Sequence, residues 1–377
     1  MARFLLGLLF IGFVCPAAAK SILVQPGGSI RAAVQNASAG DVIIVLPGIY
    51  YEGSPGDLNA VTITKDRIRL VGASSPERPV VLANAGTQGF GIWVSPPDSV
   101  GPAAQSDTEN PPCGTSGAVL KDFSLSGFTV SGFSRHGVHL ACVDGFELTR
   151  NLATDNAVYG LFPVVSQNGT VSNNEVRNTS SDAGIYIGQS DNIQIADNWA
   201  HNNLIGIEVE NSRNCAVVGN LTSDNTVGIL VDLLPGLLKK TQESTFVSFN
   251  GVKDNNRDNT AEPGDITAAI PPGTGILLLG ADTTTVRGNV VSGNNFTGIA
   301  VVSVCTGLGL LGLPCTGLDI DPNPDGNKII GNRLTNNGTV PNPLLPADLV
   351  WDGTGTGNCW SLNRYSTSFP VALPRCQ

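Results

Sequence analysis

Charged residues, histidine, methionine and tyrosine are all scarce in this chain of 377 residues. Asp, Glu, Lys and Arg together make up 14% of it, and it contains three His, five Tyr and one Met. Because imidazole and thioether ligands are few, and no Cys-x-x-Cys or His-x-His pair occurs, a zinc or copper site is not expected. No useful length of helical periodicity follows the N-terminus, and no later apolar run is long enough to cross a bilayer.

Basic residues are also few, at 21 Lys and Arg against 31 Asp and Glu.

Residues 1–19 contain Arg3, the apolar run "FLLGLLFIGFV" and an Ala-x-Ala end. This pattern predicts a secretory signal cleaved after Ala19, and so a secreted or periplasmic protein. A lipoprotein anchor at Cys15 is the alternative. Without Arg3 the formal charge is 20 − 31 = −11, which disfavours nucleic acid, and disfavours an acidic polymer unless a cation bridges.

Two markers recur along the chain, and where no loop intervenes the second recurs every 22 to 24 residues. The first closes strand-like runs such as "NIQIADN" and comprises Asn151, Asn174, Asn198, Asn220, Asn250, Asn289 and Asn332. The second opens Gly-apolar-x-apolar runs such as "GIEV" and comprises Gly91, Gly137, Gly160, Gly184, Gly206, Gly228, Gly275 and Gly298. A period of this length with short strands predicts an all-β solenoid of parallel strands.

The repeat also predicts how the coil is held and closed. Stacked Asn side chains can hydrogen-bond from one turn to the next as an asparagine ladder; the alternative is a polar binding stripe. An open solenoid end exposes a sheet edge, so caps are expected. We expect a short helix near 29–37 with Ser29 as its N-cap, a coil over 20–337 and a C-terminal cap over 338–377.

Export makes disulfides possible, and the mature chain keeps 8 − 1 = 7 cysteines. Cys215 lies five residues before Asn220, a register that predicts a buried free thiol. The other six fall into three candidate pairs. Cys305 and Cys315 bracket one loop, and Cys359 and Cys376 bracket the C-terminal tail. Cys113 and Cys142 could join the first long loop to the neighbouring turn of the coil.

Inserted loops interrupt the repeat at one corner. They follow Ser95, Asp232 and the strand that begins at Gly298, and a further loop at 257–273 precedes Gly275. Long loops on a rigid scaffold often carry function. The loops at 233–245 and 304–316 are unusually apolar, so they either pack on the coil or form a lid or a patch for a protein partner.

Alternation along each strand predicts an outward-facing column of side chains two and four residues after each Gly. This column carries aromatic or imidazole rings on early turns and carboxylates in the middle: Trp93, His139, Phe162, Tyr186, Glu208, Glu210 and Asp232. Glu210 and Asp232 should be direct neighbours ~5 Å apart at the backbone. Asp182 borders the same patch, and Arg213, Lys239 and Lys240 lie close to the acids in sequence.

Exposed rings beside paired carboxylates suit a sugar site, in which the rings stack on apolar sugar faces. We therefore expect Glu208, Glu210 and Asp232 to be catalytic, and the substrate to be bound by Trp93, His139, Phe162, Asp182, Tyr186 and Arg213. At ~5 Å the acid pair matches the spacing in retaining glycosidases, or the two could share a Ca²⁺ ion. The alternative is a solvated face with ordinary acids.

The stretch "SDAGIYIGQSDNIQIADNWAHNNLIGIEVENSRN" resembles a family of exported right-handed parallel β-helix proteins in the carbohydrate-binding and sugar-hydrolase group. The resemblance covers roughly residues 22–337. Alginate C5-epimerases of this group carry Tyr-Gly-Phe-Asp-Pro-His, and the similar run here is "YGLFPV" from Tyr159. Phe162 and Val164 occupy the Asp and His positions, so epimerase chemistry is not expected there.

Two functions follow as hypotheses. The first is an extracytoplasmic protein that binds a polysaccharide on the aromatic and acidic face, either without processing it or as a hydrolase or lyase. The second is a non-catalytic scaffold that docks a protein partner through its apolar loops, for example in copper maturation without binding copper itself.

Overall fold

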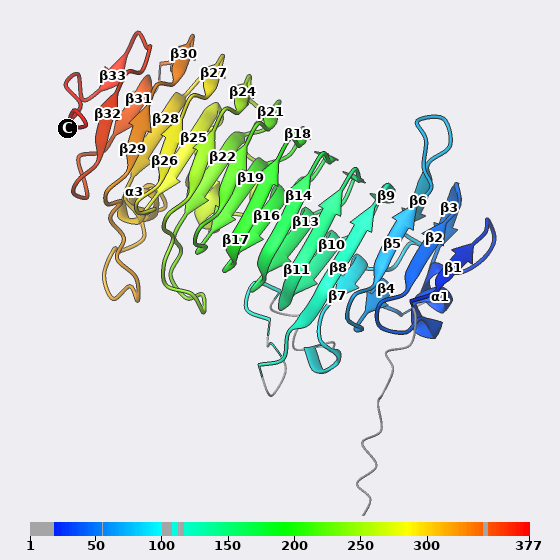
Figure 1. Ribbon diagram of the computed structural model, residues 1–377. Helices are drawn as coiled ribbons and strands as arrows, with labels where there is room; N and C mark the ends of the chain where they lie inside the picture. The colour runs from blue at the N-terminus through cyan, green and yellow to red at the C-terminus, as the bar shows by residue number, and fades with distance from the viewer. Residues whose placement is uncertain (1–18, 55, 100–107, 112, 114–116, 342–345) are drawn as a thin grey trace, which may run out of the picture.

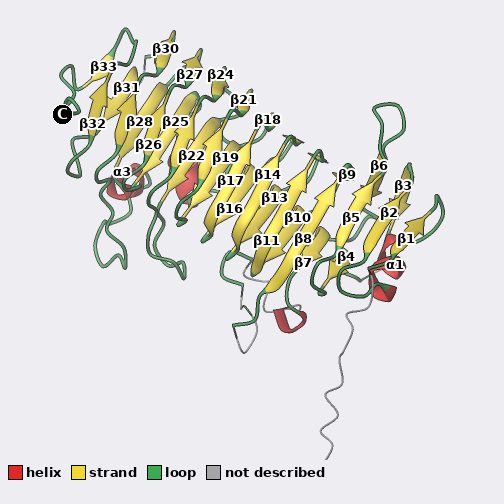
Figure 2. Ribbon diagram, in the orientation of Figure 1, coloured by secondary structure: helices red, strands yellow, loops and turns green. Residues whose placement is uncertain are grey.

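Each turn of the chain contributes up to three short strands, and successive turns stack into three long parallel sheets (Figure 1). The computed structural model describes residues 19–54, 56–99, 108–111, 113, 117–341 and 346–377. The secretory signal expected at 1–19 lies, apart from Ala19, outside the described residues. Helices are few and short, and strands dominate the molecule (Figure 2). The fold is the solenoid of parallel strands expected from the repeat, and it is the right-handed parallel β-helix that the family resemblance implies.

The three sheets are named A, B and C, and every pairing between their named strands is parallel. Sheet A contains β1 (Ser21–Val24), β2 (Val42–Val45), β5 (Arg69–Gly72), β8 (Leu120–Ser126), β11 (Val143–Thr149), β14 (Gln167–Ser172), β17 (Asp191–Ala196), β20 (Ala216–Val218), β23 (Phe246–Ser248), β26 (Thr285–Arg287), β29 (Lys328–Ile330) and β32 (Cys359–Ser361). Sheet B contains β3 (Gly48–Tyr51), β6 (Val80–Ala83), β9 (Phe128–Ser131), β12 (Leu152–Thr154), β15 (Glu175–Arg177), β18 (Trp199–His201), β21 (Leu221–Ser223), β24 (Gly251–Lys253), β27 (Val290–Ser292) and β30 (Arg333–Thr335). Sheet C contains β4 (Asn59–Ile63), β7 (Phe90–Val94), β10 (His136–Ala141), β13 (Tyr159–Val164), β16 (Ala183–Gly188), β19 (Ile205–Glu210), β22 (Val227–Asp232), β25 (Thr274–Leu279), β28 (Thr297–Val302), β31 (Ala347–Trp351) and β33 (Ser368–Phe369).

The interior of the coil is a continuous apolar core built by all three sheets. On β19 the side chains of Ile207 and Val209 join this core, while Glu208 and Glu210 alternate with them and point to the outer side. The same alternation holds on β16, where Ile185 is in the core. Sheet C therefore presents a second, outward face, which is the face that the sequence pattern singles out.

Buried amides join successive turns at two corners of the coil. At the corner from sheet A to sheet B, Asn198 Nδ2 donates to Asn220 Oδ1 at 3.0 Å, and Asn220 Nδ2 donates to Asn250 Oδ1 at 3.0 Å. Each amide also donates to a backbone carbonyl, as Asn220 does to Ile195 at 2.9 Å. A second run, which the sequence reading missed, occupies the corner from sheet B to sheet C and comprises Asn156, Asn203, Asn225, Asn255, Asn294 and Asn337.

The ends of the coil are covered differently. At the N-terminus α1 (Ile30–Asn36) begins at Ser29, whose Oγ accepts from the Ala32 N–H, as expected for an N-cap. At the C-terminus, β31, β32 and β33 extend sheets C and A, and the disulfide between Cys359 and Cys376 holds this end, as expected for a C-terminal cap. Apolar side chains such as Leu349 continue the core there.

Within the described residues, no helix has the length and apolar character needed to span a bilayer.

All three candidate cysteine pairs form disulfides, and the one left over is buried. The bonds join Cys113 to Cys142, Cys305 to Cys315 and Cys359 to Cys376. Cys215 is free and lies in the core of the coil. Burial raises the pKa of its thiol to about 12, so almost none of it is the reactive thiolate at neutral pH.

We predict that Asn220→Ala lowers the free energy of unfolding by about 1–3 kcal/mol, because the amides above and below it lose a buried partner. Urea unfolding measures this, and Asn36→Ala, at the exposed last residue of α1, is the matched control. Equal stability of the two variants would show that the buried amides contribute nothing.

We also predict that Cys215 resists a polar maleimide in the folded protein and reacts only after denaturation, because the thiol is buried and protonated. Mass spectrometry of non-reduced protein follows the labelling. Rapid labelling of the native state would contradict the register of sheet A at β20.

Candidate functional site

Strand register brings the predicted outward-facing residues together on sheet C. Glu208 is paired with Tyr186 on one side and with Leu230 on the other, and Glu210 is paired with Asp232. His139 lies between Trp93 and Phe162 in the same way. The adjacency of Glu210 and Asp232 is therefore as the sequence predicts.

The expectation that this face is exposed is wrong. The following side chains have relative exposures between 0% and 4%: Trp93, His139, Phe162, Tyr186, Glu208, Glu210 and Asp232. Together with loop residues such as Leu234, Ile266 and Val304, the outer side of sheet C builds a second apolar cluster outside the coil. The apolar loops at 233–245 and 304–316 thus pack on the coil, which was one of the two possibilities left open for them.

Several loops contribute to this cover. Glu109 and Cys113, which follow β7 in the chain, contact this face. Cys113 is bonded to Cys142, and Glu109 Oε1 accepts from the Tyr159 hydroxyl at 3.2 Å. The loop after β22 is attached through the Lys239 N–H, which donates to Gln189 Oε1 at 2.9 Å. The helices η2 (Ile266–Ala269) and α3 (Val304–Leu310) lie against each other over the later rungs.

A row of stacked rings occupies the early rungs of the face. Ring centroids are 4.0 Å apart for Trp93 and His139, 4.9 Å for His139 and Phe162, and 4.5 Å for Phe162 and Tyr186. Because each ring covers the next, their flat faces are occupied by one another. In this closed arrangement the row forms a wall of the site.

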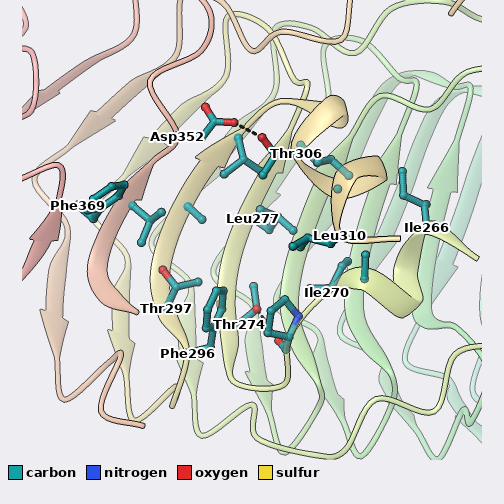
Figure 3. A pocket seen from close by; sticks show the side chains of 17 residues that line it. Ile266, Ile270, Thr274, Leu277, Phe296, Thr297, Thr306, Leu310, Asp352 and Phe369 are labelled. Atoms are coloured by element: carbon teal, nitrogen blue, oxygen red, sulfur yellow. Dashed lines mark hydrogen bonds between the residues drawn. The ribbon is translucent and has the colours of Figure 1, made fainter. Parts of the chain in front are cut away.

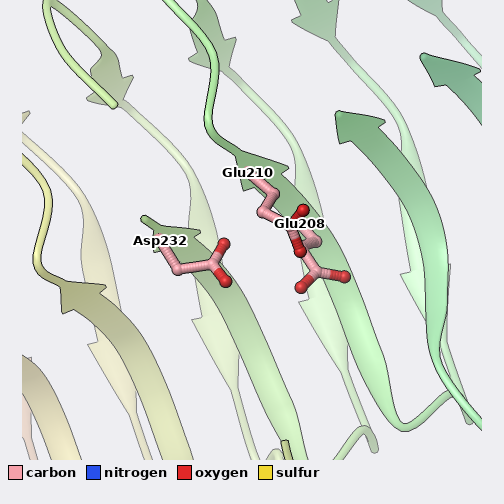
Figure 4. A group of neighbouring side chains, drawn as sticks. All are labelled: Glu208, Glu210 and Asp232. Atoms are coloured by element: carbon pink, nitrogen blue, oxygen red, sulfur yellow. The ribbon is translucent and has the colours of Figure 1, made fainter. Parts of the chain in front are cut away.

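The acids lie at the end of this row. Glu208, Glu210 and Asp232 each offer a carboxylate oxygen, and these oxygens lie within 4.8 Å of one another (Figure 4). The Tyr186 hydroxyl donates to Glu210 Oε1 at 2.8 Å, whereas both oxygens of Asp232 and one of Glu208 are buried without a hydrogen-bond partner. Asp182 borders the group, as predicted, and accepts from the Tyr159 hydroxyl at 2.8 Å.

Burial governs the protonation of these groups. Removal from water raises the pKa of Asp182 to about 7 and raises the pKa values of Glu208, Glu210 and Asp232 well above their ordinary range. Neighbouring negative charges raise the pKa values further, chiefly Asp182 at Glu208 and Asp232 at Glu210. The hydrogen bond from Tyr186 acts in the opposite direction at Glu210. Each group is thus far easier to protonate than an exposed carboxyl.

The basic residues expected near the acids are engaged elsewhere, which corrects the placement of Arg213 in the site. Arg213 Nε and Lys239 Nζ both pair with Asp191 Oδ1, at 2.9 and 2.8 Å. Lys240 pairs with Asp319. Arg213 follows the corner that leads to sheet A, where it forms a bridge with Asp191, and Lys239 and Lys240 lie on the loop after β22. None of the ion pairs among described residues includes Asp182, Glu208, Glu210 or Asp232.

Three residues of the covered face were not predicted from the sequence, namely His136, Tyr159 and Glu109. His136 and Tyr159 each precede a repeat Gly, so the position before that Gly forms a further outward column that was not considered. His136 Nδ1 lies 3.2 Å from His139 Nδ1, and burial lowers the pKa values of both imidazoles well below their usual range. Glu109 reaches the face from an irregular loop, and no spacing in the sequence indicates this.

Beyond the acids the face becomes apolar and contains a pocket of about 150 Å³ (Figure 3). Its floor is formed by Leu277, Leu279 and Ala300, and its walls include Ile270 and Leu310. Leu279 is the strand neighbour of Asp232. The pocket and the acids thus adjoin on one continuous surface.

Structural comparison shows the same architecture in other β-helix proteins. The A-modules of Azotobacter vinelandii mannuronan C-5 epimerases AlgE4 and AlgE6 are 15% and 14% identical to this chain, with TM-scores of 0.61 and 0.63; each match covers 90% of this chain and 92% or 93% of the module. DFA-IIIase from Arthrobacter chlorophenolicus A6, solved without its lid, is 14% identical over 90% of this chain and 94% of its own, with a TM-score of 0.52. At these identities the likeness concerns the fold.

Sequence comparison gives a more specific relationship. No curated protein has a significant match to the chain. The family described as periplasmic copper-binding protein (NosD) matches residues 71–261, which include every strand from β8 to β24 and Asp182, Glu208, Glu210 and Asp232. Because this match extends over just over half of the chain, the protein belongs to the NosD family of periplasmic β-helix proteins.

Proposed function

We propose that this protein binds a polysaccharide outside the cytoplasm and processes it by hydrolysis or lyase chemistry on the outer face of sheet C. The observation that supports this most strongly is the group Glu208, Glu210 and Asp232, whose oxygens lie within 4.8 Å of one another. Clustered carboxyl groups with perturbed pKa values are typical of acid–base sites. The names of the epimerases and of DFA-IIIase, which share the fold, add support by analogy.

The environments of the acids suggest their roles. Glu210 accepts a hydrogen bond from Tyr186, which favours its ionised form, so we assign it as base or nucleophile. Asp232 has no hydrogen-bond partner for either oxygen, so its protonated form is favoured and we assign it as the acid. Two neighbouring carboxyl groups whose environments separate their pKa values form the usual basis of an acid–base pair.

A sugar can reach these acids only if the covering loops move. The polar contacts that attach the loops lie at the edge of the face. They include the ion pair of Lys239 with Asp191 and the hydrogen bond from Thr260 Oγ1 to the Ser180 carbonyl at 2.5 Å. Opening at 233–245 would also expose the edge of the ring row at Tyr186, which we assign to substrate binding together with Asp182, Trp93, His139 and Phe162.

The residues present do not fit the copper that the family description implies. The imidazoles of His136 and His139 on the same face are fully buried. Their two Nδ1 atoms lie 3.2 Å apart, within hydrogen-bond distance of each other. The rings around them offer no sulfur ligand, and Cys215 lies in the core of the coil. The acids supply only oxygen, which suits hard cations better than copper. No step of the proposed reaction therefore involves copper.

A non-catalytic scaffold is the second candidate, and the apolar pocket favours it. Leu310 on the pocket wall is 45% exposed, and Leu313 and Leu238 on the adjacent loops are 47% and 65% exposed. Such side chains could bind a protein partner at 233–245 or 304–316. Glycan binding in the absence of any protein partner would favour the carbohydrate-processing protein. Binding of a protein partner without glycan binding would favour the scaffold.

We predict that Glu210→Gln and Asp232→Asn each lower glycan turnover at least ~100-fold, because a positioned acid or base typically contributes that much. A glycan array identifies the ligand, and assays for reducing ends and unsaturated products measure turnover. Glu147→Gln, which removes an exposed carboxylate from β11, is the control. Unchanged turnover in both site variants would exclude these acids as catalysts, and no glycan binding at all would favour the scaffold.

We also predict that chelator-treated protein loses stability between about pH 4 and about pH 7. The pKa of Asp182 is raised in the folded state to about 7 from 3.8, so the folded state binds more protons over this range and its stability falls as pH rises. Asp182→Asn should weaken this dependence, measured by urea unfolding, while the raised pKa values of Glu208, Glu210 and Asp232 maintain part of it, and Glu147→Gln should leave it intact. A stability that rises from pH 4 to 7, by the same amount in wild type, Asp182→Asn and Glu147→Gln, would contradict the raised pKa of Asp182.

A further inference from the structure

We propose that Glu208, Glu210 and Asp232 bind one hard divalent cation, with Ca²⁺ as the best fit, and that Asp182 borders its coordination sphere. The inference does not rest on the proposed carbohydrate activity, because a cation at this place would also hold the covered face together in a non-catalytic protein. Binding of the ion requires ionised carboxyl groups, so it competes with the protonation that is assigned to Asp232 above.

The backbone places the three ligands. Glu208 and Glu210 are two residues apart on β19 and share its outer side, and Asp232 is the strand partner of Glu210 on β22. Figure 4 shows the Asp232 carboxylate directed toward the two glutamates. Because all three positions lie in regular strands, the site is built on the rigid coil and not on a loop.

The separation of the oxygens suits Ca²⁺. Ligand oxygens lie about 2.4 Å from Ca²⁺, so two ligands on opposite sides of the ion are about 4.8 Å apart. The available oxygens of Glu208, Glu210 and Asp232 lie within 4.8 Å of one another, so one ion can bridge any two of them, and a small rotation of a side chain brings the third within reach. Mg²⁺, with contacts of about 2.1 Å, has a smaller sphere and would draw widely separated oxygens inward.

Unsatisfied oxygens provide a separate argument for a ligand. Asp232 is completely buried, and neither of its carboxylate oxygens has a hydrogen-bond partner. Glu208 Oε2 and Asp182 Oδ1 also have no partner, except where Glu208 and Asp182 share a proton with each other. Buried polar atoms are almost always paired, and a buried charge without a partner costs several kcal/mol. A cation that contacts these oxygens would satisfy several of them at once.

The protein's own cations do not serve this purpose. The basic side chains that are close in sequence, Arg213, Lys239 and Lys240, form ion pairs with Asp191 or Asp319. In the described part of the chain, Lys and Arg form no ion pair with the four carboxyl groups. An external cation or bound protons must therefore offset their charge.

Titration of the full mature protein with Ca²⁺ after treatment with a chelator tests the proposal. Calorimetry should show one site per chain, and the melting temperature should rise by several degrees at saturating Ca²⁺, since only the native state binds. Tb³⁺ should bind competitively and emit after excitation of tyrosine, because the Tyr186 hydroxyl is 2.8 Å from Glu210 Oε1. Absence of heat, of a thermal shift and of Tb³⁺ emission would overturn the proposal and leave shared protons as the source of neutrality.

Variants locate the ion. Asp232→Asn should abolish the thermal shift, because it removes an ionisable ligand that lies at the centre of the site. Glu210→Gln is the second variant if the first fails to fold, and Glu147→Gln at an exposed position should respond to Ca²⁺ like wild type. Loss of the shift in Glu147→Gln, or its retention in both site variants, would place the ion elsewhere and refute the site. Ca²⁺ binding without glycan turnover would support the cation site and refute the proposed activity. Glycan turnover without Ca²⁺ binding would support the proposed activity and refute the cation site.

Discussion

Parallel hydrogen bonding between successive turns fixes the register on which every other feature of this molecule depends. Adjacent strands are ~4.8 Å apart, so a residue placed on one turn has a fixed neighbour on the next. Glu210 meets Asp232, and Tyr186 meets Glu208, only because the backbone partners of β16, β19 and β22 are aligned without a slip. A shift by one residue would exchange the inner and outer sides of a strand, which would place carboxylates in the apolar core.

This constraint explains how much of the structure is predictable from the sequence. The Gly and Asn markers set the period, the period set the register, and the register placed the ring row and the acid pair correctly. Cys215 also follows from its distance to Asn220. The second run of amides, which includes Asn203 and Asn225, has the same period but a different offset, and it was missed because only one offset was followed.

The cover over the site is not predictable in the same way. Whether a loop folds back depends on contacts between residues far apart in sequence, such as Gln189 with the Glu109 carbonyl and Lys239 with Asp191. Neither contact belongs to the repeat. Arg213 illustrates the same limit, because a separation of three residues from Glu210 suggested proximity, whereas the corner of the coil directs its side chain to another sheet.

The corners also decide where a site can develop. From β8 to β30 only one or two residues join each strand of sheet A to the next strand of sheet B, and buried amides such as Asn198 and Asn220 fill that corner. An insertion there would break a ladder of paired amides, at a cost of about 1–3 kcal/mol for each unsatisfied group. The corner after sheet C carries the long insertions that follow β7, β22 and β28. Loops that leave from that corner can fold back over the outer face of sheet C, so Glu208, Glu210 and Asp232 on that face become buried, acquire raised pKa values and require a cation or a proton.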